Sequence, residues 1–374
     1  MTKRLLISVI FGIFVFSLGT ISPGLEIFAQ EEELRAVVLD EYEDEDGVFA
    51  VLYAGVDQYT RNHDIFAVDP VSETTINLTN GEIRMENGWS QPWEPVGNQH
   101  KVVFRQFRRT GFTYEGRIFV LEVKKGPIKI VQIPEIFDRV CSITWSNDNR
   151  TFAFLNQYGV NSSQNEVVII KDKQVEARIP IGFYGSCWAK WSPDGKWIAV
   201  ISRLGEGLLL VSTENYSVTQ IPLEGSPSGG GASSWFAWGF DSLRLALVLE
   251  GILSIIDLEG NALQTFGEAY GVDDWSANGK YISYLTRDPY SWGRQSVVLF
   301  LGGSEEVASG YEDENCGMWS PNSELLAFWA WGEWLPSLMV VGPDGKNPKV
   351  IGTAHPAGYM SPSWVKLTED LPED

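Results

Sequence analysis

The feature that most constrains the fold of this chain is a short unit that recurs along most of its length. Each copy has a tryptophan, a tight-turn sequence of Ser, Pro, Asp, Asn or Gly, and then two or three short apolar segments. The clearest copy reads Trp191-Ser-Pro-Asp-Gly-Lys-Trp-Ile-Ala-Val, and recognisable copies also begin at Trp145, Trp238, Trp275 and Trp319. A fixed repeat of this kind indicates that every copy builds the same supersecondary unit.

The spacing of the copies sets the size of that unit. The residues that we take as the marker of each copy are Tyr42, Trp89, Trp145, Trp191, Trp238, Trp275, Trp319 and Trp364. The intervals between them average about 46 residues, which is the length of four short strands with their turns and the period of a propeller blade. The sequence therefore predicts an all-β chain that folds as a seven-bladed β-propeller of four-stranded antiparallel blades.

Within each copy the strands can be placed from turn residues and alternating apolar positions. The tryptophan closes the first strand, and the Asp-Gly type of turn leads to the second. Segments such as 64–69 and 253–257 are expected to be third strands, and segments such as 75–79 and 218–222 to be fourth strands. No helical periodicity competes with this pattern beyond the first thirty residues.

Closure of the ring needs one strand from each end of the chain, because an open ring would expose unpaired strand edges. The last copy, Pro362-Ser-Trp-Val-Lys-Leu, supplies a first strand and nothing after it. We expect residues 362–367 to join the strands near residues 47–79 and to close the first blade. The alternative is that residues 36–40 supply that strand and that Trp364 packs outside.

The units resemble the TolB-type Trp-Ser-Pro-Asp-Gly-Lys repeat of bacterial periplasmic propellers and, more broadly, WD-type repeats. The resemblance covers residues from about 42 to 367 and includes the Ile-Ala-Phe-like strand and the Asp-x-x-Gly turn. It implies the propeller fold. It says little about function, because the repeat residues build the blades and the family serves many roles.

The beginning of the chain has the form of an export signal. Lys3 and Arg4 precede an apolar run over residues 5–18, and the small residue Ala29 precedes a run of acids. We expect a signal peptide over 1–29, an acidic segment over 30–46, the propeller over 47–367 and an acidic tail over 368–374. An uncleaved membrane anchor is the alternative for 1–29. Either form predicts an extracytoplasmic protein, in the periplasm, secreted or at the cell surface.

The charge of the chain restricts its partners. A net charge of −21 argues against nucleic acid and anionic lipid surfaces, which bind clustered Lys and Arg. It permits basic peptides, cations or neutral sugars, although it also serves solubility alone. One local basic spot, Arg105, Arg108 and Arg109, either balances the acids or meets an anionic partner. We expect a monomer with a protein, peptide or glycan partner, no nucleic acid, and no membrane contact beyond the possible anchor.

The predicted topology separates two faces of the ring. The connections from fourth to first strand and from second to third strand share the long-loop face, and the remaining turns share the tight-turn face. Acids and aromatics gather in the long-loop connections of the sixth and seventh blades, where binding residues concentrate in such folds. The predicted site consists of Asp273, Asp274, Tyr290, Trp292, Tyr311, Glu312, Asp313, Glu314, Trp331, Trp334 and Tyr359.

Aromatic rings stack on sugars, carboxylates accept hydrogen bonds from sugar hydroxyls, and both groups attract cations or basic peptides. The competing interpretation is that Trp331 and Trp334 fill the space between blades. Alternation along the strand places Trp329 in the core. The acidic run 40–46 lacks the ligand pattern of a calcium loop, so we expect no metal and no cofactor. The thiols of Cys141, Cys187 and Cys316 are expected to be unpaired.

Catalysis finds little support in the sequence. The three histidines are scattered, no Gly-x-Ser-x-Gly motif is present, and no catalytic residue is assigned. The leading hypothesis is a non-catalytic binding or scaffold propeller that recognises its partner through the long-loop face. The alternative is a carbohydrate-active enzyme, a glycosidase or lyase, that uses carboxylates such as Asp274 and Glu314 at the channel mouth.

Overall fold

The computed structural model describes fifteen parts of the chain: residues 48–56, 63–79, 90, 93–111, 113–123, 129–158, 165–182, 188–201, 207–227, 236–287, 294–301, 306–308, 315–331, 336–353 and 362–367. The predicted signal segment, the acidic segment and the acidic tail lie outside these ranges. None of the described segments is a helix with the length and apolar character needed to cross a bilayer.

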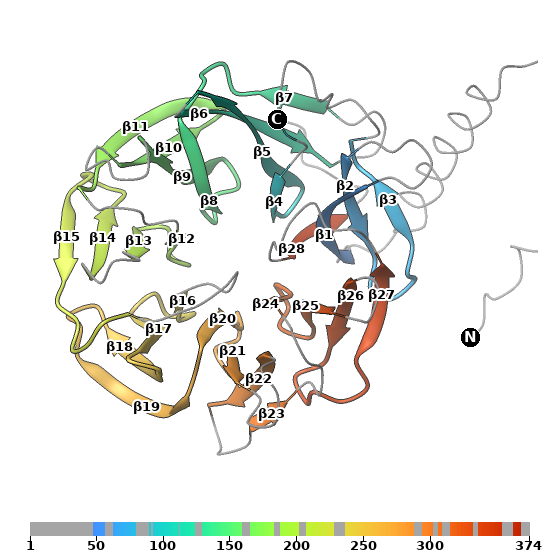
Figure 1. Ribbon diagram of the computed structural model, residues 1–374, viewed down its shortest axis with the longest axis vertical. Coiled ribbons are helices and arrows are strands. Elements are labelled where there is room, and N and C mark those ends of the chain that lie inside the picture. Colours follow the sequence, from blue (N-terminus) through green and yellow to red (C-terminus); the bar gives the residue numbers. More distant parts are fainter. Residues whose placement is uncertain are drawn as a thin grey trace, which may run out of the picture.

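The strands form seven four-stranded antiparallel sheets that stand as blades around a central axis (Figure 1). The first four blades, from the innermost strand outward, are β28 (Ser363–Leu367), β1 (Val48–Val56), β2 (His63–Val68) and β3 (Thr75–Asn77); β4 (Trp93–Asn98), β5 (Lys101–Thr110), β6 (Thr113–Glu122) and β7 (Lys129–Gln132); β8 (Arg139–Trp145), β9 (Thr151–Gln157), β10 (Glu166–Lys171) and β11 (Gln174–Pro180); and β12 (Trp188–Trp191), β13 (Trp197–Ile201), β14 (Leu208–Ser212) and β15 (Val218–Ile221).

The other three blades continue the ring in chain order. They are β16 (Phe236–Trp238), β17 (Arg244–Leu249), β18 (Ile252–Asp257) and β19 (Ala262–Glu268); β20 (Gly271–Trp275), β21 (Tyr281–Arg287), β22 (Arg294–Phe300) and β23 (Glu306–Ala308); and β24 (Asn315–Trp319), β25 (Leu326–Trp331), β26 (Pro336–Val341) and β27 (Lys349–Thr353). The predicted fold class, an all-β propeller of seven four-stranded blades, is confirmed.

The core consists of seven apolar layers, each between two neighbouring blades. Side chains alternate along a strand, so one strand serves two layers. In β5, for example, Val102 and Phe104 pack toward blade 1, whereas Val103 packs toward blade 3. Trp329 is buried between blades 7 and 1, where its ring meets Tyr53 edge-on with centroids 5.8 Å apart, as the alternation predicted.

The ring closes through the C-terminal strand. β28 pairs with β1 in antiparallel register, with Val51 opposite Trp364, so the first blade is built from both ends of the chain. The prediction that residues 362–367 close this blade is confirmed. Residues 36–40, the alternative closing strand, lie outside the described residues.

The predicted marker residue of the second blade is wrong. The innermost strand of that blade is β4, and the residue that takes the marker position is Gly97, which stands 48 residues before Trp145. An added Cβ at Gly97 would lie 2.0 Å from the carbonyl oxygen of Trp364, so the close approach of blade 1 leaves no room for a side chain. Trp89 and Tyr42, which we took as markers, lie outside the described residues.

The cysteine prediction is confirmed where it is tested. Cys141 is buried in the layer between blades 3 and 4, and its thiol is reduced. Cys187 lies outside the described residues, and the side chain of Cys316 is not described. Within the described ranges, no three His, Cys, Asp or Glu side chains gather as a metal site would require.

Candidate functional site

Most residues of the predicted site lie outside the described residues. Asp273 and Asp274 are described fully, and Trp331 ends β25, where it pairs with Pro336 at the start of β26. The eight others lie outside the described ranges: Tyr290, Trp292, Tyr311, Glu312, Asp313, Glu314, Trp334 and Tyr359. Their role in binding stays a prediction.

Asp273 and Asp274 lie in the inner strand β20, which corrects their predicted placement in a connecting loop. The register between β20 and β21 shifts between Val272 and Asp274, so Asp273 is the extra residue of a β-bulge. Asp273 is only 1% exposed, whereas the side chain of Asp274 keeps 20% of its surface exposed. The bulge thus lets two consecutive acids occupy one inner strand with different surroundings.

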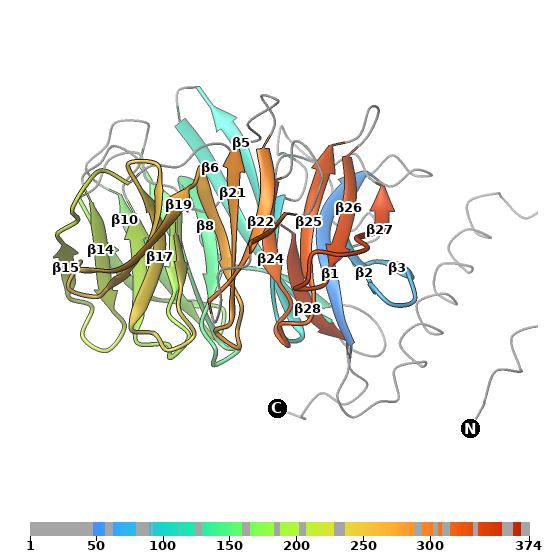
Figure 2. The same cartoon turned by 90° about the horizontal axis from the view of Figure 1, so that it is seen from below.

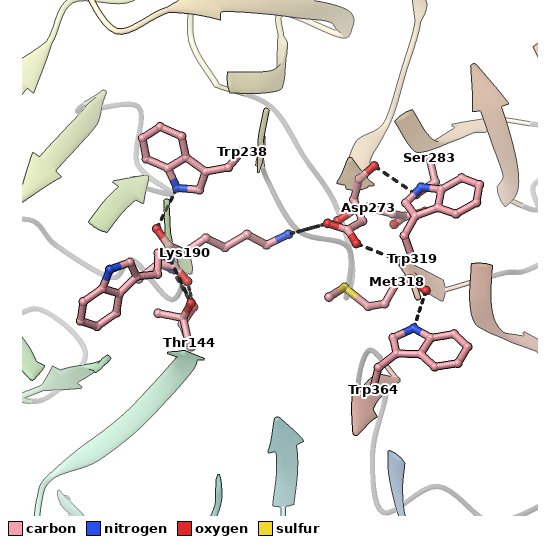
Figure 3. Close-up of polar contacts among 12 residues, drawn as sticks. Thr144, Lys190, Trp238, Asp273, Ser283, Met318, Trp319 and Trp364 are labelled. Atoms are coloured by element: carbon pink, nitrogen blue, oxygen red, sulfur yellow. Dashed lines mark hydrogen bonds and ion pairs between the residues drawn. The ribbon is translucent and has the colours of Figure 1, made fainter. Parts of the chain in front are cut away.

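Asp274 joins three blades. One carboxylate oxygen, Oδ2, accepts a hydrogen bond from the backbone N–H of Trp319 in blade 7 at 3.0 Å. The other oxygen, Oδ1, lies 4.0 Å from the ammonium of Lys190 in blade 4. Figure 3 shows the Lys190 side chain pointing toward β20, where its ammonium also donates to the backbone carbonyl of Asp273 at 3.2 Å. The ion pair therefore links blades 4 and 6 and bypasses blade 5.

The surroundings of Asp274 perturb its acidity. Burial raises the pKa of this carboxyl above its usual value, and Lys190 and the backbone N–H groups of Trp319 and Trp275 oppose the rise. A raised pKa is what a general acid needs, but here both carboxylate oxygens face partners within the protein. The arrangement favours a role in holding the inner strands together.

The bond from Trp319 to Asp274 belongs to a pattern repeated around the ring. The residue before the marker position accepts a hydrogen bond from the marker N–H of the next blade in two further places. Thr144 accepts from Trp191, and Ser363 accepts from Gly97, both through the side-chain hydroxyl oxygen at 3.0 Å. The carboxylate of Asp274 thus accepts the marker N–H of blade 7, as these two hydroxyls accept the marker N–H groups of blades 4 and 2.

At other blade junctions the marker residue again donates to the preceding blade, but a side-chain N–H donates to a backbone carbonyl. The indole N–H of the marker tryptophan donates to the backbone carbonyl of the preceding blade, at 2.9 Å in each case. The pairs are Trp145 to Val96, Trp238 to Lys190 and Trp364 to Met318. Figure 3 shows two of these bonds beside the Asp274 cluster. At most junctions the inner strands are thus joined either by a backbone N–H that donates to a side-chain oxygen or by an indole N–H that donates to a backbone carbonyl.

Sequence reasoning missed Lys190. Its position, directly before the marker tryptophan of its copy, is also the position of Asp274 in the sixth copy. Opposite charges at equivalent positions of two repeats are a signal that the side chains of inner strands face one another. Comparison of the copies position by position would have found this pair.

The basic spot of the second blade lies on a hairpin of the long-loop face. β5 and β6 have ten residues each, and they rise above the neighbouring strands in Figure 2. Arg108 forms an ion pair with Glu115 across the hairpin at 2.6 Å, so this arginine balances an acid. Arg109 is exposed at the tip, and its guanidinium donates to the carbonyl of Gly111 at 3.0 Å.

The fold is similar to several solved propellers. A crystal structure of TolB from Acinetobacter baumannii has a TM-score of 0.51 and 15% identity, over 90% of this chain and 72% of that chain. A 6-phosphogluconolactonase-like protein from Bacteroides uniformis has a TM-score of 0.57 and 13% identity, over 86% of this chain and all of that one. A protein of unknown function from Desulfotomaculum acetoxidans has a TM-score of 0.56 and 13% identity, over 85% and 99%.

Identities this low show a likeness of fold and leave function open. No family model matches the chain, and no curated protein matches its sequence. The resemblance of the repeats to the TolB type is therefore confirmed for the architecture alone.

Proposed function

We propose that this protein is a non-catalytic binding or scaffold propeller that works outside the cytoplasm. It recognises a protein, peptide or glycan through its long-loop face, and it acts as a monomer. The observation that carries this proposal is the engagement of Asp274, the one carboxyl of the suggested acid pair that the structure describes. Because both of its oxygens face Trp319 and Lys190, it is better suited to stabilising the ring than to protonating a substrate.

The two faces of the ring differ in the residues that they carry, and this difference supports the proposal. On the tight-turn face, short turns bond to the next blade: the backbone N–H of Asp194 donates to the hydroxyl of Ser242 at 2.9 Å, and that of Asn278 donates to Ser323 at 3.0 Å. These bonds commit the turn residues to the scaffold. The segments that the sequence assigns to the long-loop connections are rich in acids and aromatics, which have the chemistry to bind a glycan or a basic peptide.

A carbohydrate-active enzyme remains the second candidate, and the raised pKa of Asp274 is the observation that favours it. The similar solved propellers do not separate the two, since TolB and the lactonase-like protein share the fold. An enzyme of this kind would need Asp274 with a second carboxyl, for which Glu314 is the candidate.

Arrays of glycans and peptides probed with the full chain test the binding proposal. We expect one ligand class to bind, and we expect Trp334→Ala to weaken that binding about tenfold or more. The matched control is Leu243→Ala, which removes an exposed apolar side chain from the tight-turn face and should leave binding unchanged. Turnover of a polysaccharide that Asp274→Asn abolishes in a folded protein would establish the enzyme instead.

A further inference from the structure

We propose that the hairpin of β5 and β6, together with Arg139 at the start of β8, binds an acidic, extended peptide segment of a partner protein. This inference rests on the proposed binding function and deepens it by naming a surface and a partner class. The surface lies on blades 2 and 3, so it is independent of the acids and aromatics of blades 6 and 7.

The hairpin extends beyond the blade that carries it. β4 pairs with β5 only as far as Arg105, and β7 pairs with β6 only from Phe119 onward. β5 and β6 continue to pair with each other as far as Thr110 and Thr113. The outer part of this two-stranded ribbon therefore stands clear of the four-stranded sheet, as Figure 2 shows.

Backbone bonding along the ribbon follows the alternation of an antiparallel pair, in which every second residue of a strand directs its N–H and C=O outward. Phe107 and Gly116 form one outward-facing pair. Phe107 bonds to Ser90, and Gly116 exchanges two hydrogen bonds with Phe137. The next outward-facing pair toward the tip is Arg109 and Tyr114. In the described ranges, no backbone group of another strand meets this pair.

The rung formed by Gly116 and Phe137 already shows how a further chain can align beside β6. An extended peptide that continued this alignment would meet the outward N–H and C=O of Tyr114. Addition of a strand to an exposed edge is a common mode of peptide recognition, in which backbone bonds give affinity and side chains give specificity.

Two exposed arginines lie near that edge: Arg139 beside Tyr114, and Arg109 on β5, directly opposite Tyr114. Arg139 is exposed, and its guanidinium lies over the ring of Tyr114 at 6.0 Å from the centroid. The Tyr114 ring is itself held edge-on by Phe107, with centroids 6.2 Å apart. Arg139 and Arg109 have no carboxylate partner among the described residues, whereas Arg108, Arg150 and Arg178 each pair with an acid. Two guanidinium groups thus remain available to a ligand.

The charge of the second blade supports an acidic partner. Residues 93–132 include eight cationic residues: Lys101, Arg105, Arg108, Arg109, Arg117, Lys124, Lys125 and Lys129. The same segment has three acids: Glu94, Glu115 and Glu122. This excess of positive charge stands in a chain whose net charge is −21, so the blade differs in sign from the molecule that carries it. Complementary charge steers a partner to such a patch and fixes its position.

An acidic peptide matches both the open strand edge and the two arginines of this surface. Its backbone supplies the groups that an open edge pairs with, and Asp or Glu at alternate positions places carboxylates on one side of the added strand. The planar guanidinium fork matches the carboxylate in geometry. An anionic polysaccharide would meet the arginines but would leave the strand edge unused.

Fluorescence anisotropy with a labelled decapeptide of alternating Val and Glu tests the proposal on the full chain. We expect the double variant Arg109→Ala, Arg139→Ala to weaken binding at least tenfold. The matched control is Arg150→Ala, which removes an arginine with 63% side-chain exposure from the tight-turn face of blade 3 and should change affinity less than twofold. Thermal unfolding of each variant establishes that it is folded.

A second arm tests the strand edge on the ligand side. The same decapeptide with N-methyl groups at alternate backbone positions keeps its charge but cannot pair with an edge, and we expect it to bind at least tenfold more weakly. Equal binding of the methylated peptide, of polygalacturonate, or of the double variant would overturn the proposal. So would a dimer in sedimentation equilibrium that the double variant dissolves, because the occupant would then be a second copy. Peptide binding that survives Trp334→Ala separates this surface from the site of the proposed function.

Discussion

Asp274 is held by groups from three blades, and its ionisation is therefore tied to the stability of the inner strands. Burial raises the pKa of this carboxyl, so the folded state binds the proton more tightly than the unfolded state does. The stabilisation that Asp274 contributes is complete below its ordinary pKa of 3.8 and is lost as pH rises through the raised folded value.

The first prediction concerns Asp274→Asn. We expect the unfolding free energy of the unmodified protein, relative to this variant, to fall as pH rises from about 4 toward neutrality. Urea unfolding at a series of pH values measures it. The control is Asp257→Asn, because hydrogen bonds led by Asn261 lower the pKa of Asp257, so its relative stability should be constant above about pH 4 and should fall as pH drops below 3.8. A relative stability that grows with pH for the Asp274 pair would contradict the prediction.

The second prediction concerns Gly97. A methyl group there would meet the backbone of Trp364 at 2.0 Å and Leu52 at 2.8 Å, so Gly97→Ala should cost about 1–3 kcal/mol of unfolding free energy. Gly267→Ala is the control, because nothing lies within 4 Å of its added Cβ and it should be neutral or slightly stabilising. Chemical denaturation compares the two, and equal stability would show that blade 1 moves aside at no cost.

Among individual residues, the sequence predicts the marker tryptophans that recur in the copies, but it misses positions where a copy departs from the pattern. Trp145, Trp191 and Trp319 end inner strands as predicted. A search for tryptophan selects Trp89 because Gly97 gives no sign that it stands in the same position. The contact between Lys190 and Asp274 is also hidden, since it joins residues 84 positions apart and depends on the geometry of the closed ring.

Among the elements, the short strand β28 joins the first blade to both of its neighbours. Its five residues include Trp364, Val365 and Leu367, which are buried in the layers on either side of blade 1. The strand also supplies the hydroxyl of Ser363 and the indole N–H of Trp364 to neighbouring blades. The same five residues therefore complete a sheet, two core layers and two polar junctions.

The third prediction is that Trp364→Ala lowers the unfolding free energy by about 3–5 kcal/mol, because it opens a cavity at the ring closure and removes the bond to Met318. Thermal and urea unfolding measure the loss. Leu243→Ala, at an exposed tight turn, should change stability by less than about 0.5 kcal/mol. Similar losses in both variants would mean that the closure contributes no more than an exposed turn.

Strand positions follow from the sequence wherever one face of a strand is buried. The copy around Trp191 is an example, because β13 and β14 are short, largely apolar and buried segments. The length of β5 does not follow. Its outer half, Gln106 to Thr110, is largely polar and lies beyond the sheet, so no apolar alternation marks it as a strand.

In the whole molecule, apolar packing acts between adjacent blades, whereas electrostatic repulsion acts between acidic residues all around the ring. Each apolar layer joins only adjacent blades, while a net charge of −21 acts across the entire ring. Self-repulsion of this kind destabilises a compact state and is screened by salt.

The fourth prediction follows from that charge. Raising NaCl from about 10 mM to 150 mM shortens the screening length from about 30 Å to about 8 Å, so the melting temperature at pH 7 should rise. Differential scanning calorimetry measures the shift. Near pH 4.6, the isoelectric point, the same change of salt should have little effect. If salt raised the melting temperature equally at both pH values, the rise would not come from screening of the net charge, and the prediction would be wrong.

The pairing of Val51 with Trp364 spans 313 residues of the chain, so it also sets an order of events. Blades 2 to 7 are each contiguous in sequence and can assemble as soon as their own residues are available. Blade 1 must wait, because its innermost strand is the last to be synthesised. Contacts between distant segments form slowly. We therefore expect the docking of the C-terminal strand to be the final step of folding, and a chain interrupted before residue 363 to retain an open edge on β1 that invites pairing with other chains.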